Sequence, residues 1–317
     1  MKYSFIIPCY NSEKTIKCVL DEIHKEMDKI KFTDYEIIAV NDCSPDNVYG
    51  ILKEIASYDK KTKVINLAKN AGKHAAVLAG MKMSSGKIII NLDDDGQCPL
   101  NELNNLLQPL DKGYDIAIAK YERKRESLLK RLGSKFNSFV TRILLDKPKN
   151  LYIGNFSAVK RFVVNEMLNY TNPYPYLGGL FLQSTSKIVN VNMIERERSC
   201  GKSNYSLKKS IKLWLNGFTA FSVKPLRISS LLGICCALIG FVFGSITIIR
   251  KIFIKNISAG WSSTISVMLF IGGLIMLMLG MIGEYIGRIY ISINNSPQYV
   301  IKEKINFDSD ENEKYDE

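Results

Sequence analysis

The sequence predicts an α/β fold: a mostly parallel sheet with crossover helices, followed by interfacial helices and two transmembrane helices. Three observations predict it. Short apolar runs alternate with helical patterns from residue 3 to residue 119. Polar or acidic residues follow one strand after another, at the sheet edge where open α/β sheets bind ligands. Two uncharged runs, 228–249 and 262–282, are each long enough to cross the roughly 30 Å hydrocarbon core of a bilayer.

The N-terminal elements follow one another in a regular order. Apolar runs rich in Ile and Val are predicted as strands at 3–8, 35–40, 64–67, 88–92 and 115–119. Helical patterns lie between them at 12–30, 47–58, 70–84 and 100–110, and Ser12 is the expected N-cap of the first helix. This alternation is typical of parallel strands joined by crossover helices. No G-x-G-x-x-G motif follows the first strand, so a dinucleotide site of the usual kind is excluded.

An acidic run, Asp93-Asp94-Asp95, directly follows the predicted strand 88–92. Alternate side chains of an extended segment share a face, so we expect Asp93 and Asp95 to act together and Asp94 to point away. Three carboxylates this close repel one another unless a cation lies among them, and oxygen ligands suit Mg²⁺ or Mn²⁺. Asp93 and Asp95 are therefore the predicted metal ligands. A solvated acidic turn is the alternative interpretation.

Two basic segments lie between the sheet and the membrane spans. In 121–145 a helical pattern carries Lys130, Arg131, Lys135 and Arg142 on its polar face. We interpret it as a basic rim that faces phosphates near a bilayer, and a solvated basic face is the alternative. In 206–223 a Trp- and Phe-bearing stripe runs beside several lysines. Such a helix next to a membrane span is typical of the interface, and a core-facing helix is the alternative.

Charge and cysteine content narrow the partners and the compartment. The formal net charge is +12 and the pI is about 9.2, so anionic partners are expected: nucleic acid, acidic lipid headgroups or phosphorylated substrates. The seven cysteines form no C-x-x-C pair and there are two histidines, which gives no zinc pattern. We expect the cysteines to be small buried groups in a reducing compartment.

The C-terminal part is predicted as a membrane hairpin. Arg250-Lys251 ends the first span, and Glu284 and Arg288 follow the second uncharged run. Glycine pairs four residues apart, Gly240/Gly244 and Gly283/Gly287, permit close helix packing, so we expect a homo-oligomer. Ordinary transmembrane composition is the alternative explanation of these glycines, and it is slightly favoured. The N-terminus lacks a signal peptide, so both termini are expected in the cytoplasm. The expected organisation is 1–205 for the α/β domain, 206–226 for an interfacial helix, 227–290 for the hairpin (228–249 and 262–286) and 291–317 for a tail, disordered over its acidic part 308–317.

Motifs along the chain resemble those of a known family. Four of them occur in order: Ile6-Ile7-Pro8-Cys9-Tyr10-Asn11, Asn41-Asp42-x-Ser44-x-Asp46, Asn70-x-Gly72-Lys73 and Asp93-x-Asp95-x-Gln97. This set resembles the inverting family 2 glycosyltransferases of GT-A fold. Three more motifs narrow the resemblance: Arg198-x-x-Gly201-x-Ser203-x-Tyr205, Pro225-Leu226-Arg227 and Gly283-Glu284-Tyr285-x-Gly287-Arg288. They resemble the polyprenyl-phosphate glycosyltransferases with a two-span C-terminal hairpin, to which dolichol-phosphate mannose synthases are more distantly similar. The resemblance covers about residues 2–302.

The resemblance implies roles for individual residues. Pro8, Tyr10 and Asp42 would line the base and ribose, with Asp42 accepting a hydrogen bond from the base. Asp93 and Asp95 would hold the diphosphate through Mg²⁺ or Mn²⁺. The implied catalytic residues are Asp93, Asp95, Gln97 (near the sugar) and Arg198 (on a phosphate). The implied substrate-binding residues are Pro8, Tyr10, Asn11, Asp42, Asn70, Lys73, Arg125, Arg131 and Ser203, of which Arg125 and Arg131 would bind the acceptor phosphate.

The implied activity is inverting transfer of a sugar from a nucleotide sugar, in the first place a UDP-hexose, to undecaprenyl phosphate. It would take place at the cytoplasmic face of the inner (plasma) membrane, where the protein is expected as a multi-pass protein with no nucleic-acid partner. One departure stands out: many relatives carry an Asp before a Phe-Arg pair where this chain has 151–156 without an acid, followed by Ser157. A lipid phosphate is already ionised at pH 7 and needs positioning more than a general base.

Three other interpretations stay open at this point. A GDP-mannose-dependent polyprenyl-phosphate mannosyltransferase is one alternative, because the sequence does not identify the nucleotide or the sugar. A processive polysaccharide synthase is disfavoured because neither Trp214 nor Trp261 lies in a Gln-x-x-Arg-Trp motif. A non-catalytic membrane scaffold would use the basic face for anionic lipid.

Overall fold

The computed structural model describes residues 2–121, 147–172, 175–194, 196, 260–294 and 297–307, with scattered positions between 231 and 253. Almost all of the predicted basic segment 121–145 lies outside these residues. So do the predicted interfacial helix 206–226, much of the first predicted span and the acidic tail 308–317.

An eight-stranded sheet lies at the centre of the described part, in the order β7-β5-β6-β4-β1-β2-β3-β8. Its strands are β1 Tyr3–Cys9, β2 Tyr35–Asn41, β3 Thr62–Leu67, β4 Ile88–Asn91, β5 Ile116–Tyr121, β6 Ser157–Lys160, β7 Ile188–Met193 and β8 Ile301–Ile305. The strands β4-β1-β2-β3 pair in parallel, as do β5 and β7. The strands β6 and β8 run antiparallel to their neighbours. The predicted sheet is therefore confirmed, with two reversed strands added to it.

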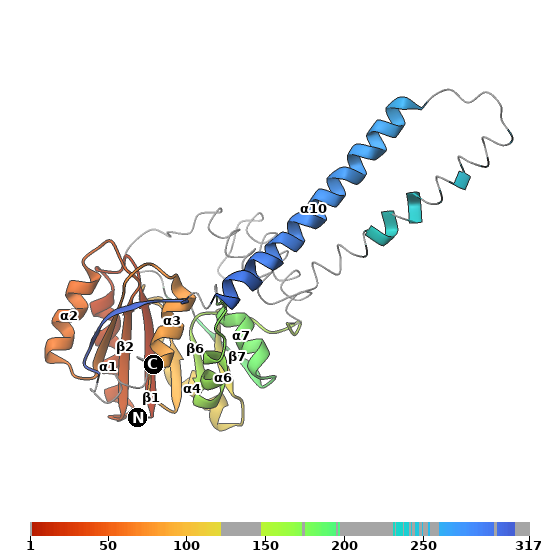
Figure 1. Cartoon of the computed structure of the whole chain (residues 1–317). Helices are drawn as coiled ribbons and strands as arrows, with labels where there is room; N and C mark the ends of the chain where they lie inside the picture. The colour runs from red at the N-terminus through yellow and green to blue at the C-terminus, as the bar shows by residue number, and fades with distance from the viewer. Residues whose placement is uncertain are drawn as a thin grey trace.

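Helices cover both faces of this sheet (Figure 1). They are α1 Ile16–Lys29, α2 Val48–Tyr58, α3 Lys73–Lys82, the 3₁₀ turn η1 Leu100–Glu102 with α4 Leu103–Asp111, α6 Arg161–Leu168 and α7 Leu177–Ser184. One hydrophobic core joins α1, α2 and α4 to one face, and a second joins α3, α6 and α7 to the other. Alternate β1 side chains point to opposite faces, so Phe5 and Ile7 enter the first core and Ile6 enters the second.

Helix α3 packs unusually close to the sheet because of Gly80. A Cβ built at Gly80 would lie 2.6 Å from Ile6 Cγ2 and 3.1 Å from Val40 Cγ2. No larger residue fits there without moving the helix or the strands. This close approach fixes the height of the N-terminus of α3, which begins at Lys73 beside the acidic run.

Two helix starts differ from prediction, and several elements were not predicted. Helix α1 begins at Ile16 with Thr15 as its N-cap, and Ser12 lies before a turn in which its carbonyl oxygen accepts the N–H groups of Thr15 and Ile16. Helix α3 begins three residues after Asn70. We did not predict β6, α6, α7 and β7, nor the strand β8 within the segment expected as a tail.

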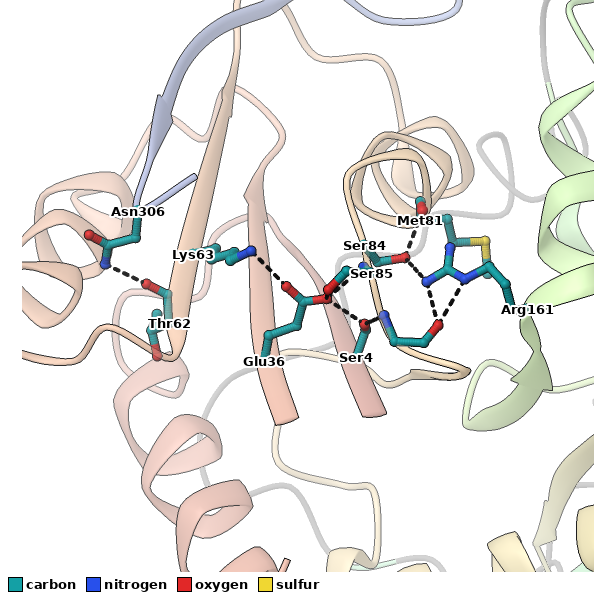
Figure 2. A network of polar contacts seen from close by, with 10 residues as sticks. Ser4, Glu36, Thr62, Lys63, Met81, Ser84, Ser85, Arg161 and Asn306 are labelled. Carbon is teal, nitrogen blue, oxygen red and sulfur yellow. Dashed lines mark hydrogen bonds and ion pairs between the residues drawn. The ribbon is translucent and has the colours of Figure 1, made fainter. Parts of the chain in front are cut away.

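A buried polar network ties together the amino ends of β1, β2 and β3, at the edge opposite the acidic run (Figure 2). Glu36 is fully buried; its Oε1 accepts from Ser4 Oγ at 2.6 Å and from the Ser85 N–H at 2.7 Å. Its Oε2 lies 2.9 Å from Lys63 Nζ. Arg161 closes the network by donating to the Gly86 carbonyl oxygen at 2.6 and 2.8 Å. The turn before β4 is held in place by these contacts.

Helix α10, Trp261–Ile293, extends away from the sheet (Figure 1), and its Phe270–Ile291 stretch has a mean hydropathy of 1.7. By length and composition this is the one helix within the described residues that could cross a membrane. It coincides with the second predicted span. The chain then returns to the sheet, where β8 pairs antiparallel with β3.

Candidate functional site

The predicted site residues gather at the carboxyl edge of four neighbouring strands. Tyr10 follows β1, Asp42 follows β2, Asn70 follows β3 and Asp93 follows β4. These strands are adjacent in the order β4-β1-β2-β3, so residues distant in sequence lie along one edge. The same edge receives the loop that leads into β6, because β6 runs antiparallel to β4 and pairs Ser157 with Asn91.

Asp93 is held from two sides. Its Oδ1 lies 2.5 Å from Lys73 Nζ, at the start of α3. Its Oδ2 accepts from Asn155 Nδ2 at 3.1 Å, from the loop before β6. Asp93 and Lys73 keep about a quarter to a third of their side-chain surface exposed, so a ligand can reach both.

Asp94 has partners that differ from those of Asp93. Its Oδ2 accepts the Tyr10 N–H at 3.0 Å, and its carbonyl oxygen accepts from Thr15 Oγ1 at 2.6 Å. Burial raises the pKa of the Asp94 carboxyl to about 6, against the opposing hydrogen bond from Tyr10. Asp94 therefore attaches the acidic turn to the loop after β1.

Asp95 and Gln97 form the rest of the acidic turn. Asp95 Oδ1 accepts the Gln97 N–H at 3.1 Å. Gln97 Nε2 donates to the Arg196 carbonyl oxygen at 3.2 Å, and the Arg196 N–H donates back to the Gln97 carbonyl oxygen at 3.3 Å. Arg196 also pairs with Glu22. The chain after β7 is thereby attached to the acidic turn.

Asp42 organises the loop after β3. Its two carboxylate oxygens accept the N–H groups of Ala71 at 2.6 Å and Gly72 at 3.0 Å, and its carbonyl oxygen accepts from Asn70 Nδ2 at 3.1 Å. Gly72 has φ +87°, a conformation that favours glycine. Burial raises the pKa of Asp42, against these hydrogen bonds. The described contacts thus give Asp42 a part in placing Lys73, and they leave its expected contact with a base as a prediction.

The loop after β1 is fixed by the loop after β2. The Asn11 N–H donates to Ser44 Oγ at 2.8 Å, and Ser44 Oγ donates to Asp46 Oδ1 at 2.6 Å. Asn11 has φ 57°, which asparagine tolerates better than most residues. Tyr10 is left 43 % exposed at the edge. The Tyr10 side chain is therefore accessible to a ligand, and its expected contact with the base stays a prediction.

A cavity of about 170 Å³ opens beside Asp93, between α3, β4, the loop before β6 and the start of α7. Its polar lining includes two buried atoms without a hydrogen-bond partner among the described residues, Asn91 Oδ1 and His74 Nδ1. The His74 ring packs edge-on against Tyr176, with 5.5 Å between ring centroids. Burial, together with Lys73, lowers the pKa of His74 to about 4, so the ring is neutral at pH 7.

Some predicted site residues lie outside the described residues: Arg125, Arg131, Arg198 and Ser203. Conversely, sequence reasoning missed Asn155, Asn91 and His74 as site residues. Asn91 carried a signal, because it is the one polar residue in the apolar run 88–92. Asn155 stands directly before Phe156, where many relatives carry an Asp, and this resemblance was its signal; its place beside Asp93 depends on the direction of β6.

The donor set suits a hard divalent cation. Within the described ranges, no group of three or more His, Cys, Asp and Glu side chains is placed to hold a metal ion. Asp93 and Asp95 supply two carboxylates, and Mg²⁺ is often held by one or two carboxylates plus substrate phosphates. The residues present therefore fit a cation that binds together with a diphosphate.

Comparison with known proteins gives two family matches. Residues 4–168 match the model of glycosyl transferase family 2, and residues 224–289 match that of the GtrB C-terminal hairpin. Glycosyltransferase YkcC of Bacillus subtilis is 33 % identical over 95 % of this chain and 94 % of its own length. A prophage-derived bactoprenol glucosyl transferase of Shigella flexneri is 31 % identical over 95 % and 98 %. The undecaprenyl-phosphate 4-deoxy-4-formamido-L-arabinose transferase of Yersinia pestis is 31 % identical over 98 % and 96 %.

Solved structures share the arrangement of the sheet and its helices. Glucosyl-3-phosphoglycerate synthase of Mycobacterium tuberculosis, in complex with Mn²⁺, UDP and glucosyl-3-phosphoglycerate, has a TM-score of 0.50 and 19 % identity over 74 % of this chain and 80 % of that one. Mannosyl-3-phosphoglycerate synthase of Rubrobacter xylanophilus has a TM-score of 0.52 and 17 % identity over 73 % and 75 %. At this identity the likeness concerns the fold.

Proposed function

The chain belongs to glycosyl transferase family 2, and we propose that it transfers a sugar, with inversion, from a nucleotide sugar to undecaprenyl phosphate. The donor we propose first is a UDP-hexose. The product is a lipid-linked monosaccharide for a cell-surface glycan or lipid. The predictions of a GT-A fold and of glycosyltransferase activity are confirmed by the family.

The observation that carries this proposal is the likeness over nearly the whole chain to transferases named for bactoprenol and undecaprenyl phosphate. That likeness spans the C-terminal hairpin as well as the α/β domain. A likeness confined to the α/β domain would support nucleotide-sugar chemistry without indicating a lipid acceptor.

For the metal, we propose that Asp93 and Asp95 hold Mg²⁺ or Mn²⁺ together with the donor diphosphate. Once bound, the cation would neutralise the negative charge that develops on the departing nucleoside diphosphate. The fold neighbour from M. tuberculosis, which contains Mn²⁺ and UDP, supports this assignment. Lys73 lies next to Asp93 and brings a second positive group to the same phosphates.

The acceptor chemistry explains the missing acid. Asn155 stands directly before Phe156, the place where many relatives have a carboxylate, and an amide cannot take up a proton. A lipid phosphate is already ionised at pH 7, so no proton has to be removed from it. In this site Asn155 instead donates to Asp93 and so fixes the orientation of that carboxylate.

The GtrB-type hairpin makes the protein membrane-associated. We propose further that it is a multi-pass protein of the inner (plasma) membrane, with two spans and a cytoplasmic catalytic domain. The glycines of α10 support a homo-oligomer: a Cβ built at Gly272, Gly280 or Gly283 meets no atom of the described residues within 4 Å, and small residues of this kind permit close packing of a neighbouring helix.

The test is transfer by the full-length protein in vesicles that contain undecaprenyl phosphate. Labelled UDP-glucose, UDP-galactose, UDP-N-acetylglucosamine and GDP-mannose are supplied in turn, with Mg²⁺, with Mn²⁺ or with EDTA. We expect one donor to give a labelled lipid only when a divalent cation is present. GDP-mannose as that donor would make the protein a mannosyltransferase, and no donor at all would contradict the proposal.

The metal assignment is tested by Asp95→Asn. Loss of a carboxylate ligand should lower the transfer rate at least a hundredfold, roughly 3 kcal/mol in transition-state free energy. Asp111→Asn, at the exposed end of α4, is the matched control and should leave the rate unchanged. If Asp95→Asn transferred sugar at the wild-type rate, Asp95 would not be a ligand of the cation.

A further inference from the structure

The cavity beside Asp93 is lined in part by residues to which the proposed reaction assigns no role. It measures about 170 Å³, room for roughly five or six water molecules at about 30 Å³ each. Such a space is of the size of a single sugar ring. Its position beside Asp93 places its occupant next to the proposed diphosphate site.

Two polar atoms in the lining lack partners among the described residues. Asn91 is 3 % exposed; its Nδ2 donates to Ser157 Oγ at 3.2 Å, which leaves Oδ1 as a buried acceptor. The second atom is His74 Nδ1, also buried. Buried polar groups are normally hydrogen-bonded, and each specific exception calls for an explanation. Ligand hydroxyls that enter the cavity can satisfy these atoms, because a hydroxyl can donate to Asn91 Oδ1 and can either donate to or accept from His74 Nδ1.

The charge of the lining limits the ligand further. Among the described lining residues, the charged side chains are Lys73 and Asp93, and they pair with each other at 2.5 Å. His74 is neutral, and the polar side chains Asn91, Asn155 and Ser157 carry no charge. A charged sugar substituent would therefore be buried here without a counter-ion, which is costly.

The apolar lining supplies the other half of a sugar site. Ile153, Leu177 and Phe181 line the cavity together with the Tyr176 ring. The C–H faces of a sugar ring pack on aliphatic and aromatic groups while its hydroxyls turn to the polar atoms. Pockets for small molecules combine such walls with a few placed polar groups.

We propose that this cavity takes the sugar ring of the nucleotide sugar, and that Asn91 and His74 select an uncharged ring bearing hydroxyl groups. The inference rests on the proposed function, since it places the transferred group of that reaction. It goes further in naming the residues that discriminate between donors, and in excluding uronic acids and sugars with a free amine.

The experiment measures binding by the full-length protein with Mg²⁺ or Mn²⁺ present, so that the sugar contribution is separated from that of the nucleotide. The probes are UDP, UDP-glucose and UDP-glucuronate, with GDP and GDP-mannose as a second set. Wild-type protein should bind the uncharged sugar nucleotide at least tenfold more tightly than the glucuronate. Equal affinity for the two would overturn the proposal.

Variants then assign the effect to the two residues. Asn91→Asp and His74→Gln should each weaken binding of the uncharged sugar nucleotide about tenfold, while the Kd of the nucleotide alone changes less than twofold. Asn104→Asp adds the same charge at an exposed position of α4 and His24→Gln changes a histidine of α1; neither should have an effect. Thermal denaturation checks folding, and Asn91→Ser serves if Asn91→Asp does not fold.

The outcomes separate this inference from the proposed function. If both cavity variants bind the sugar nucleotide as wild type does while transfer to lipid continues, the cavity is not the sugar site and the proposed function stands. If wild-type protein binds none of the nucleotides with either cation, the proposed function fails and this inference fails with it.

Discussion

At the level of single residues, Asp93 is the point on which the site depends, and it is already paired. Lys73 and Asn155 occupy its two oxygens. An ion pair as accessible as Lys73–Asp93 contributes about 1 kcal/mol or less to stability. We infer that Lys73 is retained for its position beside the phosphates, and that it competes with a metal for Asp93 before the nucleotide arrives.

This competition gives a prediction for Lys73→Gln. Loss of the Lys73 ammonium group frees Asp93, so the affinity of the protein for Mn²⁺ alone should rise severalfold. The affinity for the nucleotide sugar should fall at least tenfold, because a phosphate contact is lost. Titration of Mn²⁺ by electron paramagnetic resonance measures the first effect, and nucleotide binding the second. Lys82→Gln, at the other end of α3, is the control; a fall in Mn²⁺ affinity in Lys73→Gln would contradict the competition.

How far single residues could be predicted depended on their place relative to the strands. Asp42, Asn70 and Asp93 directly follow parallel strands, so their convergence was implied by the order of elements. Asn155 precedes a short antiparallel strand, so its convergence required knowledge of the direction of that strand. The partner of Asp94 was likewise hidden, because a backbone N–H has no signature in the sequence.

At the level of elements, the amino ends of β1, β2 and β3 are joined by the buried pair Glu36–Lys63 (Figure 2). Burial acts to raise the pKa of Glu36. Hydrogen bonds from Ser4 and Ser85, with Lys63, outweigh it and hold the pKa below its usual range. A group whose folded-state pKa is depressed stabilises the fold above its unfolded pKa and loses that contribution as the pH falls.

The prediction is that Glu36→Gln destabilises the protein by about 3 kcal/mol at pH 7, because Lys63 is left buried without its counter-ion. The difference in unfolding free energy between Glu36→Gln and wild type should shrink as the pH falls below about 4.3, the pKa of glutamate in the unfolded chain. It should go on shrinking as the pH falls through the lower pKa that Glu36 has in the folded protein. Urea denaturation at pH 7 and pH 3.5 measures both. Glu54→Gln, exposed on α2, should show neither effect. A difference that did not change with pH would show that Glu36 does not titrate with unfolding.

The elements that escaped prediction are short or distant in sequence from their partners. The strand β6 has four residues, too few for a periodic pattern to be recognised. The strand β8 has three charged residues between two isoleucines, a composition equally typical of an exposed tail. Charged residues are common on edge strands, because they discourage pairing with other chains. The five predicted strands, by contrast, are largely buried and apolar, and all are confirmed.

At the level of the whole molecule, the chain leaves the sheet after β7 and returns to it as β8 after the long apolar helix α10. The segment that returns is attached at several points. Gln298 Nε2 donates to the carbonyl oxygens of Tyr170 and Asn172 at 2.8 and 2.7 Å. Glu303 accepts from Tyr49 Oη at 2.5 Å. These contacts attach the segment after α10 to the α/β domain, and we propose that, with α10 in a bilayer, they limit how far the domain tilts above it.

Asn306 contacts three backbone carbonyl groups in this attachment, and it gives the last prediction. Its Nδ2 approaches the carbonyl oxygens of Ala56 at 2.7 Å, Asp59 at 3.3 Å and Thr62 at 2.8 Å, and its φ is 64°. Asn306→Gly keeps that backbone conformation and removes the side chain, so it should lower the free energy of unfolding by about 1–3 kcal/mol. Asn306→Ala should cost about 1 kcal/mol more, because alanine disfavours a positive φ.

The functional consequence of detaching β8 concerns the membrane and not the donor. In both Asn306 variants, binding of the nucleotide sugar should stay within twofold of wild type. Asn306 follows β8 and packs against the segment that joins α2 to β3, away from the carboxyl edge of the strands. Transfer to undecaprenyl phosphate in vesicles should fall severalfold, since the α/β domain is then held above the bilayer by one connection. A short-chain polyprenyl phosphate in detergent should largely restore the rate, because it needs no fixed orientation of the domain. Equal losses with both acceptors would mean that β8 supports the catalytic site itself and does not orient it.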